Sequence, residues 1–355
     1  MTDPLYPQCR PMLIGSQPLK DHDAAMHLVL THVPEIPNWV QLPVYPQEGM
    51  VAQFVGGMPG LTQREGRAFV DTAAPTFNDQ LVAFFEAYLA QTDLGGEVEK
   101  SRFGLTPECA RGFFTLIKAL AVPSDGRFAV KGQITGPITF CTSLTDQDRR
   151  AVFYDDTVRD AGVKLLALKA AWQARRLDRF GLPVIIFVDE PALAGFGSSE
   201  MISISREDIA ACLQEVATAI HGQGALVGVH VCANTDWSLL LDGGVDIVNF
   251  DAHGYFDKFL LYVDQIKSFL QSGGCLAWGM VPTLQPDQVA AETVESLWER
   301  WQSYLQQMTR LGLDEAQIKR QSFITPSCGT GSLPPELSER VLVLTEALSR
   351  KIRQA

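Results

Sequence analysis

The sequence lacks any run of about 18 apolar residues, so we expect no transmembrane helix. Its first residues, MTDPLYPQCR, have neither the charged start nor the apolar stretch of a secretory signal peptide. Cysteine is scarce: there are seven, an odd number spread over 355 residues, which does not fit a disulfide framework. These features together predict a cytoplasmic protein with reduced thiols.

Positive charge is also in short supply. Lysine and arginine number 29 against 41 aspartate and glutamate residues, which gives a net charge of −12. The basic residues form only short, scattered runs, whereas nucleic-acid phosphates are bound by clustered cations. We therefore expect neither nucleic acid nor a membrane as a partner.

What the sequence does contain is a recurring order of apolar strand, turn and amphipathic helix. Helices fit between the strands: Ser205 is the expected N-cap of a helix over residues 206–222, and residues 286–312 have helical spacing up to a glycine. Eight segments have the continuous apolar character of parallel strands that are covered on both faces. These segments are residues 12–16, 38–45, 128–136, 184–190, 225–232, 245–251, 275–281 and 322–328.

Eight strands that alternate with helices favour a (β/α)8 TIM barrel, an α/β fold, over a doubly wound sheet. A length of 355 residues and a hydrophobic fraction of 46% fit one such catalytic domain over residues 1–355. Residues 46–105 are long for a single connection. We predict that they form an insertion or lid near the early strands.

Catalytic groups in such barrels lie at the carboxyl ends of the strands. His230 and Cys232 end the fifth candidate strand and, being two residues apart, point to the same face. Cys328 ends the eighth strand and Asp251 the sixth. Imidazole and thiolate are ligands that zinc prefers, and Asp251 would add an oxygen ligand, with His253 as its competitor.

A lone His-x-Cys pair is more often structural than metal-binding, and free cysteine is commonly a small buried hydrophobe. Zinc is favoured here because three separate strand ends supply ligand-type residues on one predicted rim. A zinc ion with two thiolate ligands holds an incoming thiol as a thiolate near neutral pH. Such a site favours alkyl transfer to sulfur over hydrolysis.

Two further strand ends carry polar side chains. Asp189, in VDEPAL, either holds the ammonium of an amino-acid thiol or belongs to a structural strand-to-helix turn. Glu190 points to the opposite face and is expected to be structural. Ser16, in LIGSQP, offers a hydroxyl for a substrate carboxylate, and ITGPIT over residues 134–139 forms a turn at the same rim.

Six motifs in this order resemble those of a known family. LIGSQP, ITGPITF, VDEPAL, HVC, the acid that ends VDIVNFD, and PSCG resemble the catalytic C-terminal barrel of cobalamin-independent methionine synthases. That family lies in a superfamily with uroporphyrinogen decarboxylase and the corrinoid methyltransferases. The resemblance runs from about residue 12 to residue 335. It implies a zinc site of His230, Cys232, Asp251 and Cys328, with homocysteine contacts from Ser16 and Asp189.

The chain departs from this family at two places. Asp251 is one methylene shorter than the glutamate that the family places there. The family's other amine-binding glutamate, expected near residues 60–70, has no clear match, and Glu65 is the candidate.

The activity that the resemblance implies is methyl transfer to a thiol, with homocysteine as the first choice and methionine as the product. The methyl donor would be methylcobalamin or methyltetrahydrofolate, and a corrinoid would arrive on a partner protein. One alternative is a metal-free lyase like uroporphyrinogen decarboxylase, with Asp189 as its acid. Others are a methylcobalamin:coenzyme M-type methyltransferase and a non-catalytic protein that binds a corrinoid or a methyltransferase.

Overall fold

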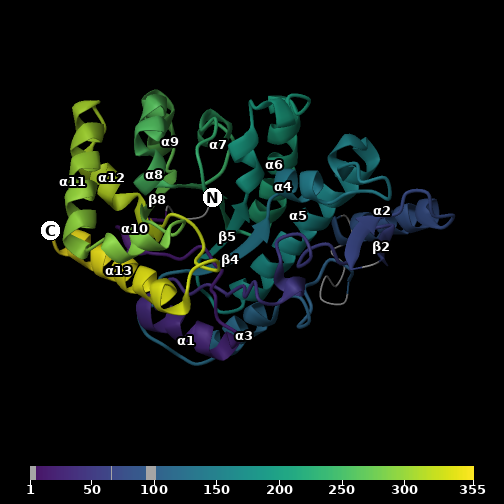
Figure 1. Ribbon diagram of the computed structural model, residues 1–355, viewed down its shortest axis with the longest axis horizontal. Helices are drawn as coiled ribbons and strands as arrows, with labels where there is room; N and C mark the ends of the chain where they lie inside the picture. Colours follow the sequence, from purple (N-terminus) through teal and green to yellow (C-terminus); the bar gives the residue numbers. More distant parts are fainter. Residues whose placement is uncertain (1–4, 65, 93–100) are drawn as a thin grey trace.

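The computed structural model describes residues 5–64, 66–92 and 101–355 (Figure 1). Its centre is a seven-stranded parallel sheet with the order β1-β9-β8-β7-β6-β5-β4. The first strand of the chain pairs with the last, so the sheet curls back on itself. The strands are β1 (Arg10–Pro11), β4 (Val130–Thr135), β5 (Val184–Asp189), β6 (Leu226–Val231), β7 (Ile247–Phe250), β8 (Cys275–Val281) and β9 (Ser322–Pro326).

Helices surround this sheet. Figure 1 shows α6, α7, α9 and α11 along one side of the molecule and α13, α1 and α3 along the other. The helices are α1 (His22–His32), α2 (Phe77–Thr92), α3 (Arg111–Leu120), α4 (Pro137–Ser143), α5 (Asp156–Asp178), α6 (Arg206–His221), α7 (Ser238–Leu241), α8 (Ala252–Phe259), α9 (Val263–Gln271), α10 (Pro286–Ala291), α11 (Val294–Arg310), α12 (Glu315–Arg320) and α13 (Pro335–Gln354). None of the described helices has the length and apolarity needed to cross a membrane.

Two of the eight predicted strands, those over residues 12–16 and 38–45, are not regular strands. Isolated parallel bridges take their place: Gln41 pairs with Ser16, and Asn38 pairs with β4. Prolines flank and interrupt the second segment, and a proline has no N–H to donate to a ladder. The other six predicted strands are confirmed as β4 to β9, so the main sheet of the described residues has seven strands where eight were predicted.

The predicted helix after Ser205 is confirmed as α6. Ser205 Oγ accepts a hydrogen bond from the N–H of Asp208 at 3.0 Å, as a capping box requires. The single helix predicted over residues 286–312 is instead two helices, α10 and α11. Thr293 ends the first by capping the second, since its Oγ1 accepts a hydrogen bond from the N–H of Ser296 at 3.1 Å.

The two faces of the sheet bury different side chains, because residues alternate along each strand. One face, which includes Val229, Phe250 and Trp278, packs with the helices into the large core. The other face carries a smaller apolar cluster of Met12, Ile36, Ala129, Ile185, Phe187, Ile247, Cys275, Ala277 and Phe323. Two residues beyond Phe187 and Ile247, the same face presents Asp189 and Asn249. On this face, polar side chains at the carboxyl ends of the strands therefore lie directly after a buried apolar cluster.

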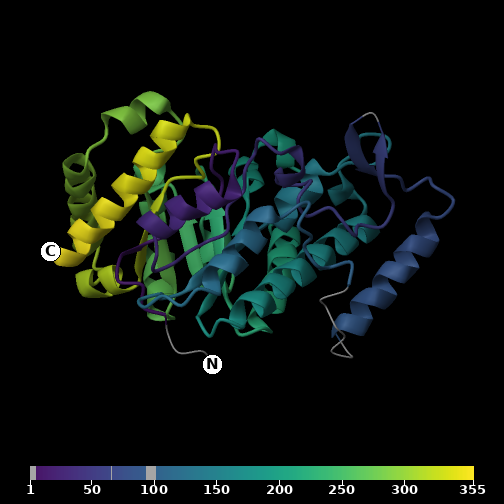
Figure 2. The same cartoon turned by 90° about the horizontal axis from the view of Figure 1, so that it is seen from below.

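The segment predicted as an insertion or lid holds a hairpin of β2 (Leu61–Arg64) and β3 (Arg67–Val70), followed by α2. Figure 2 shows this hairpin and α2 at one end of the molecule. The hydroxyl of Tyr88 on α2 donates to Glu215 Oε1 on α6 at 3.1 Å, which ties the segment to the outer helices. Its role as a lid stays a prediction.

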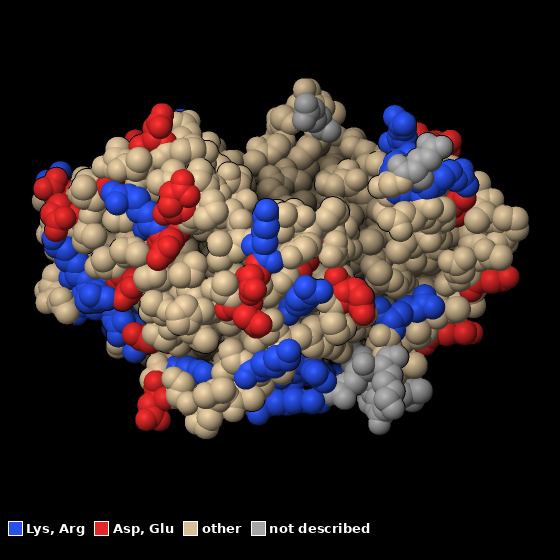
Figure 3. Space-filling view, turned by 60° about the horizontal axis from the view of Figure 1, so that its bottom comes forward, with Lys and Arg blue, Asp and Glu red and all other residues tan. Residues whose placement is uncertain are grey.

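Surface charge on the face in Figure 3 lies in several small groups, with acidic side chains among the basic ones.

Candidate metal centre

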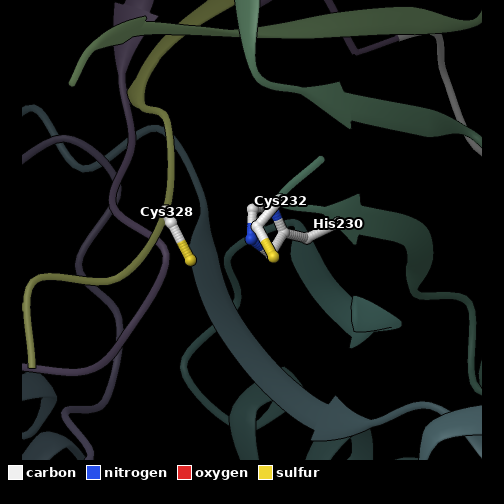
Figure 4. A group of neighbouring side chains, drawn as sticks. All are labelled: His230, Cys232 and Cys328. Carbon is white, nitrogen blue, oxygen red and sulfur yellow. The ribbon is translucent and has the colours of Figure 1, made fainter. Parts of the chain in front are cut away.

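Three of the four predicted ligands meet at the carboxyl ends of β6 and β9 (Figure 4). The ligand atoms of His230, Cys232 and Cys328 all lie within 4.8 Å of one another. Figure 4 shows the side chain of Cys328 next to that of Cys232, with the imidazole of His230 beside Cys232. No other group of three such side chains occurs in residues 5–64, 66–92 and 101–355.

A bulge in β8 helps to bring the last cysteine into this group. The register between β8 and β9 shifts between Gly279 and Val281, and such bulges re-aim the side chains that follow. A Cβ on Gly279 would lie 2.8 Å from Ser327 Cα, so only glycine permits this close approach of the two strands. Cys328 follows directly and reaches the end of β6 from across the sheet.

Ser16 contacts the loop that follows Cys328. The N–H of Thr330 donates to Ser16 O at 2.9 Å, and the N–H of Gly331 donates to Ser16 Oγ at 3.3 Å. A Cβ on Gly329 would lie 2.1 Å from Ser16 Oγ. The structure therefore places Ser16 beside the segment that carries Cys328, and its contact with a substrate carboxylate stays a prediction.

Asn249, which sequence reasoning missed, sets the orientation of the histidine ring. Its Nδ2 donates to Ala277 O at 2.8 Å and to Thr325 Oγ1 at 2.9 Å, and its Oδ1 contacts His230 Nδ1. Both amide hydrogens are used, so Oδ1 only accepts, and Nδ1 of the ring must carry the proton. The signal in the sequence was a polar residue within VDIVNFD, two positions before Asp251 and therefore on the same face.

The other ring nitrogen of His230 is left with a lone pair. Nε2 is buried and has no hydrogen-bond partner within the described residues. Burial lowers the pKa of His230 to about 4, although the hydrogen bond that the ring donates to Asn249 acts in the opposite direction, so the ring is neutral near pH 7. A buried acceptor without a partner costs about 1–3 kcal/mol, which a coordinated metal ion would offset.

The two cysteines interact with each other. A hydrogen bond to Cys328 lowers the pKa of Cys232 to about 7, and the same bond together with burial raises the pKa of Cys328. The nearby charges of Asp189 and Asp251 act against the ionisation of Cys232. The pair thus readily releases one proton near neutral pH.

Asp251 and His253, the two candidates for an oxygen or nitrogen ligand after β7, lie outside this group. The N–H of Gly254 donates to Asp251 Oδ1 at 2.8 Å, because the carboxylate caps the start of α8. His253 Nε2 instead lies 2.9 Å from Glu292 Oε1. The structure therefore brings together three of the four predicted ligands.

Asp189 ends β5, the strand beside β6, and it pairs in register with His230 of the candidate metal centre. Its Oδ1 is buried and has no hydrogen-bond partner within the described residues. Burial raises the pKa of Asp189 to about 7, and the charge of Lys131 opposes this shift. The aspartate is thus placed to meet a cationic group, and its contact with a substrate stays a prediction. Glu65, the other candidate for such a contact, lies outside the described residues.

Glu190 joins two of the motifs. It is fully buried, and its carboxylate accepts hydrogen bonds from the N–H groups of Ile138 and Thr139, both at 2.9 Å, and from Thr139 Oγ1 at 2.7 Å. Its own N–H donates to His230 O at 2.9 Å. The side chain therefore locks ITGPIT to VDEPAL, which is consistent with the structural role expected for it.

Replacing Gly136 with alanine is expected to lower the free energy of unfolding by about 1–3 kcal/mol, as overpacking of a tight core does. The added Cβ would lie 2.1 Å from the carboxyl carbon of Glu190. Urea unfolding measures the effect, and Gly56→Ala is the matched control, since a Cβ there meets nothing within 4 Å. Equal stability of the two variants would contradict tight packing between Gly136 and the Glu190 carboxylate.

Comparison with known proteins gives one result for the fold. No protein-family profile matches the chain, and no curated protein does. Among solved structures it is similar to a protein from Listeria monocytogenes that carries the name of a vitamin B12-independent methionine synthase, with a TM-score of 0.53 and 11% sequence identity. The match covers 93% of this chain and 85% of that one. The likeness is one of fold.

Proposed function

We propose that this chain is a zinc-dependent methyltransferase that moves a methyl group to a thiol, with homocysteine as the substrate and methionine as the product. One observation carries the proposal: Nε2 of His230 is buried without a partner in the described residues, while Asn249 occupies the other ring nitrogen. The sulfurs of Cys232 and Cys328 lie in the same group. One imidazole and two thiolates are the ligand set of catalytic zinc sites that keep a position open.

The residues of the site would divide the work in a simple way. His230, Cys232 and Cys328 would hold the metal, and Asn249 would keep the ring in the ligating tautomer. Bound zinc stabilises the deprotonated form of a thiol and so makes sulfur nucleophilic near neutral pH. The chain then has only to orient the substrate, for which Asp189 would bind the ammonium group.

The full architecture that we propose is a closed (β/α)8 barrel, in which residues 38–41 take the place of the eighth strand. Backbone hydrogen bonds on both sides of this segment support closure. The N–H of Gln17 donates to Gln41 O at 2.9 Å, and the N–H of Lys131 donates to Pro37 O at 3.0 Å. Closure would place all strand ends around one rim, as in TIM-barrel enzymes.

For the methyl donor we propose a methylcorrinoid, brought by a partner protein, or methyltetrahydrofolate. The likeness to a methionine-synthase-like fold and the predicted thiol chemistry support a donor of this class. All seven cysteines of the chain are unpaired, which is in keeping with our proposal of a reducing compartment, the cytoplasm.

One observation favours a second candidate function. The raised pKa of Asp189 suits a general acid in a metal-free lyase. That alternative leaves His230 Nε2 buried without a role, and it predicts no bound metal.

Protein purified without chelator is expected to contain one zinc per chain and to methylate homocysteine with methylcobalamin or methyltetrahydrofolate as donor. Removal of zinc should abolish methyl transfer, because without the metal the substrate thiol is no longer stabilised as a thiolate. Added zinc should restore the activity. Metal analysis and product formation across a panel of thiols test this. Protein that is isolated without metal and methylates no thiol would favour the lyase. Full methyl transfer by zinc-free protein, or zinc-loaded protein that methylates no thiol, would contradict the proposal.

A further inference from the structure

We infer that Lys131 of β4 is a positioning residue for the candidate metal centre, because it anchors LIGSQP (residues 13–18), the segment that holds the loop after Cys328. This role rests on the proposed function, and it concerns the metal centre before any substrate binds. Lys131 would act on the ligands through backbone segments and not as a ligand itself.

Lys131 is fully buried on the inner face of the curled sheet. Its Nζ lies 4.9 Å from the centre of the Phe187 ring, which belongs to the small apolar cluster of that face. Nζ donates hydrogen bonds to Ile14 O at 2.5 Å and to Gln133 Oε1 at 3.3 Å. Burial lowers the pKa of Lys131 to about 8, and the charge of Asp189 opposes this shift. A buried ammonium group is costly unless it is hydrogen-bonded, so the side chain and its acceptors stay together.

Three side chains of β4 point to this inner face, because residues alternate along a strand. Each donates to a backbone carbonyl in an earlier part of the chain. The three bonds are Lys131 Nζ to Ile14 O, Gln133 Nε2 to Trp39 O at 2.8 Å, and Thr135 Oγ1 to Met50 O at 2.8 Å. Isolated bridges take the place of a regular ladder in this region. The side chains of β4 therefore supply hydrogen bonds that would otherwise come from a regular second strand.

The approach of β4 to LIGSQP also depends on a glycine. A Cβ on Gly15 would lie 2.7 Å from Gln133 Nε2 and 3.0 Å from Gln41 Oε1. A larger residue at this position would push the Gln133 amide away. The packing around Gly15 thus shows, independently of the bond from Lys131, that LIGSQP lies directly against β4.

The carbonyl that Lys131 binds lies two residues before Ser16, and Ser16 binds the loop after Cys328. Ser16 O accepts hydrogen bonds from the N–H of Thr330 at 2.9 Å and from Thr330 Oγ1 at 3.0 Å. Cys328 lies two residues before Thr330. Hydrogen bonds and short backbone segments therefore connect Lys131 to one of the three ligands. A ligand loop that is ordered before the metal arrives binds it more tightly, since the competent state is already populated.

The charge of Lys131 and its role as an anchor have opposite effects on zinc binding. An interior cation repels a metal cation, so loss of the charge alone would leave zinc affinity unchanged or raise it. Loss of the anchor would let the loop of Cys328 move, and zinc would bind more weakly. The sign of the change in zinc affinity therefore separates the two effects.

The variant Lys131→Met keeps the length of the side chain and removes the ammonium group. Its zinc affinity, measured by competition with a chromophoric chelator, is expected to fall about tenfold, as loss of a charge-assisted hydrogen bond implies. Lys169→Met on α5 is the matched control, because Lys169 is also buried and its Nζ also donates to a backbone carbonyl, that of Gly104, at 3.3 Å. The control should stay within about threefold of the wild type, a change smaller than one hydrogen bond.

Thr330→Val tests the other end of the connection, since it removes the bond from Oγ1 to Ser16 O. Its zinc affinity should fall about fivefold, the equivalent of one neutral hydrogen bond. In the double variant with Lys131→Met the two losses should not add, because both act through Ser16. Amide hydrogen exchange in the metal-free protein gives a second measurement. The N–H groups of Thr330 and Gly331 should exchange faster in Lys131→Met and at the wild-type rate in Lys169→Met.

Unchanged or tighter zinc binding in Lys131→Met would overturn the inference, and so would an equal loss in the Lys169→Met control. Fully additive losses in the double variant would overturn it as well. If Lys131→Met does not fold, wild-type zinc affinity in Thr330→Val would still do so. Wild-type protein that holds zinc but methylates no thiol would overturn the proposed function and leave this role of Lys131 in place.

Discussion

A Cys328→Ser variant is expected to lose more than about 100-fold in zinc affinity, a larger effect than the about 10–100-fold that loss of a supporting residue causes. Cys328 belongs to the group of three side chains whose ligand atoms lie within 4.8 Å of one another, and a serine oxygen is a poor zinc ligand. Methyl transfer to thiol should fall with the metal content. Chelator competition and product formation at saturating zinc measure the two effects separately.

Cys109→Ser is the matched control for this variant. Cys109 is also half-buried, but its sulfur interacts with Thr106, on a turn before α3, and it does not belong to the group of His230, Cys232 and Cys328. It should keep full zinc content and full turnover. If Cys328→Ser did the same, the assignment of the metal centre would be wrong.

An Asn249→Ala variant is expected to lose about 10–100-fold in zinc affinity although Asn249 is not itself a ligand. The loss follows because the ring of His230 would no longer be held with its proton on Nδ1 and its lone pair on Nε2. The metal-free protein should also lose about 2–4 kcal/mol in free energy of unfolding, since buried partners are left without hydrogen bonds.

Thr325→Val separates these two effects. It removes one acceptor of the Asn249 amide, which donates to Thr325 Oγ1 at 2.9 Å, but it leaves the contact with His230 in place. The metal-free protein should be destabilised while zinc affinity changes little. Urea unfolding in the presence of chelator and zinc titration give the two quantities. Equal losses of zinc affinity in both variants would mean that the effect comes from general packing and not from the histidine tautomer.

The fold could be predicted from the sequence as far as the elements identify themselves locally. Continuous apolar runs such as residues 275–281 marked buried parallel strands, and Ser205 marked the start of α6. The prediction of a regular strand over residues 38–45 was wrong. Whether a stretch flanked by prolines joins a hydrogen-bonded ladder depends on the strands that lie beside it in the fold. Likewise, the break between α10 and α11 came from Thr293, which is a capping residue only once the chain turns there.

By itself the sequence determined which residue types end the strands, and through the two-residue period it placed His230 and Cys232 on one face. Only the tertiary structure decided which distant groups join them. The bulge at Gly279 brings Cys328 into the group, while the cap of α8 holds Asp251 out of it. The role of Asn249 likewise depends on acceptors from two other strands. Spacing along the chain specifies which face a side chain lies on, whereas distances between strand ends depend on register, bulges and caps formed between elements.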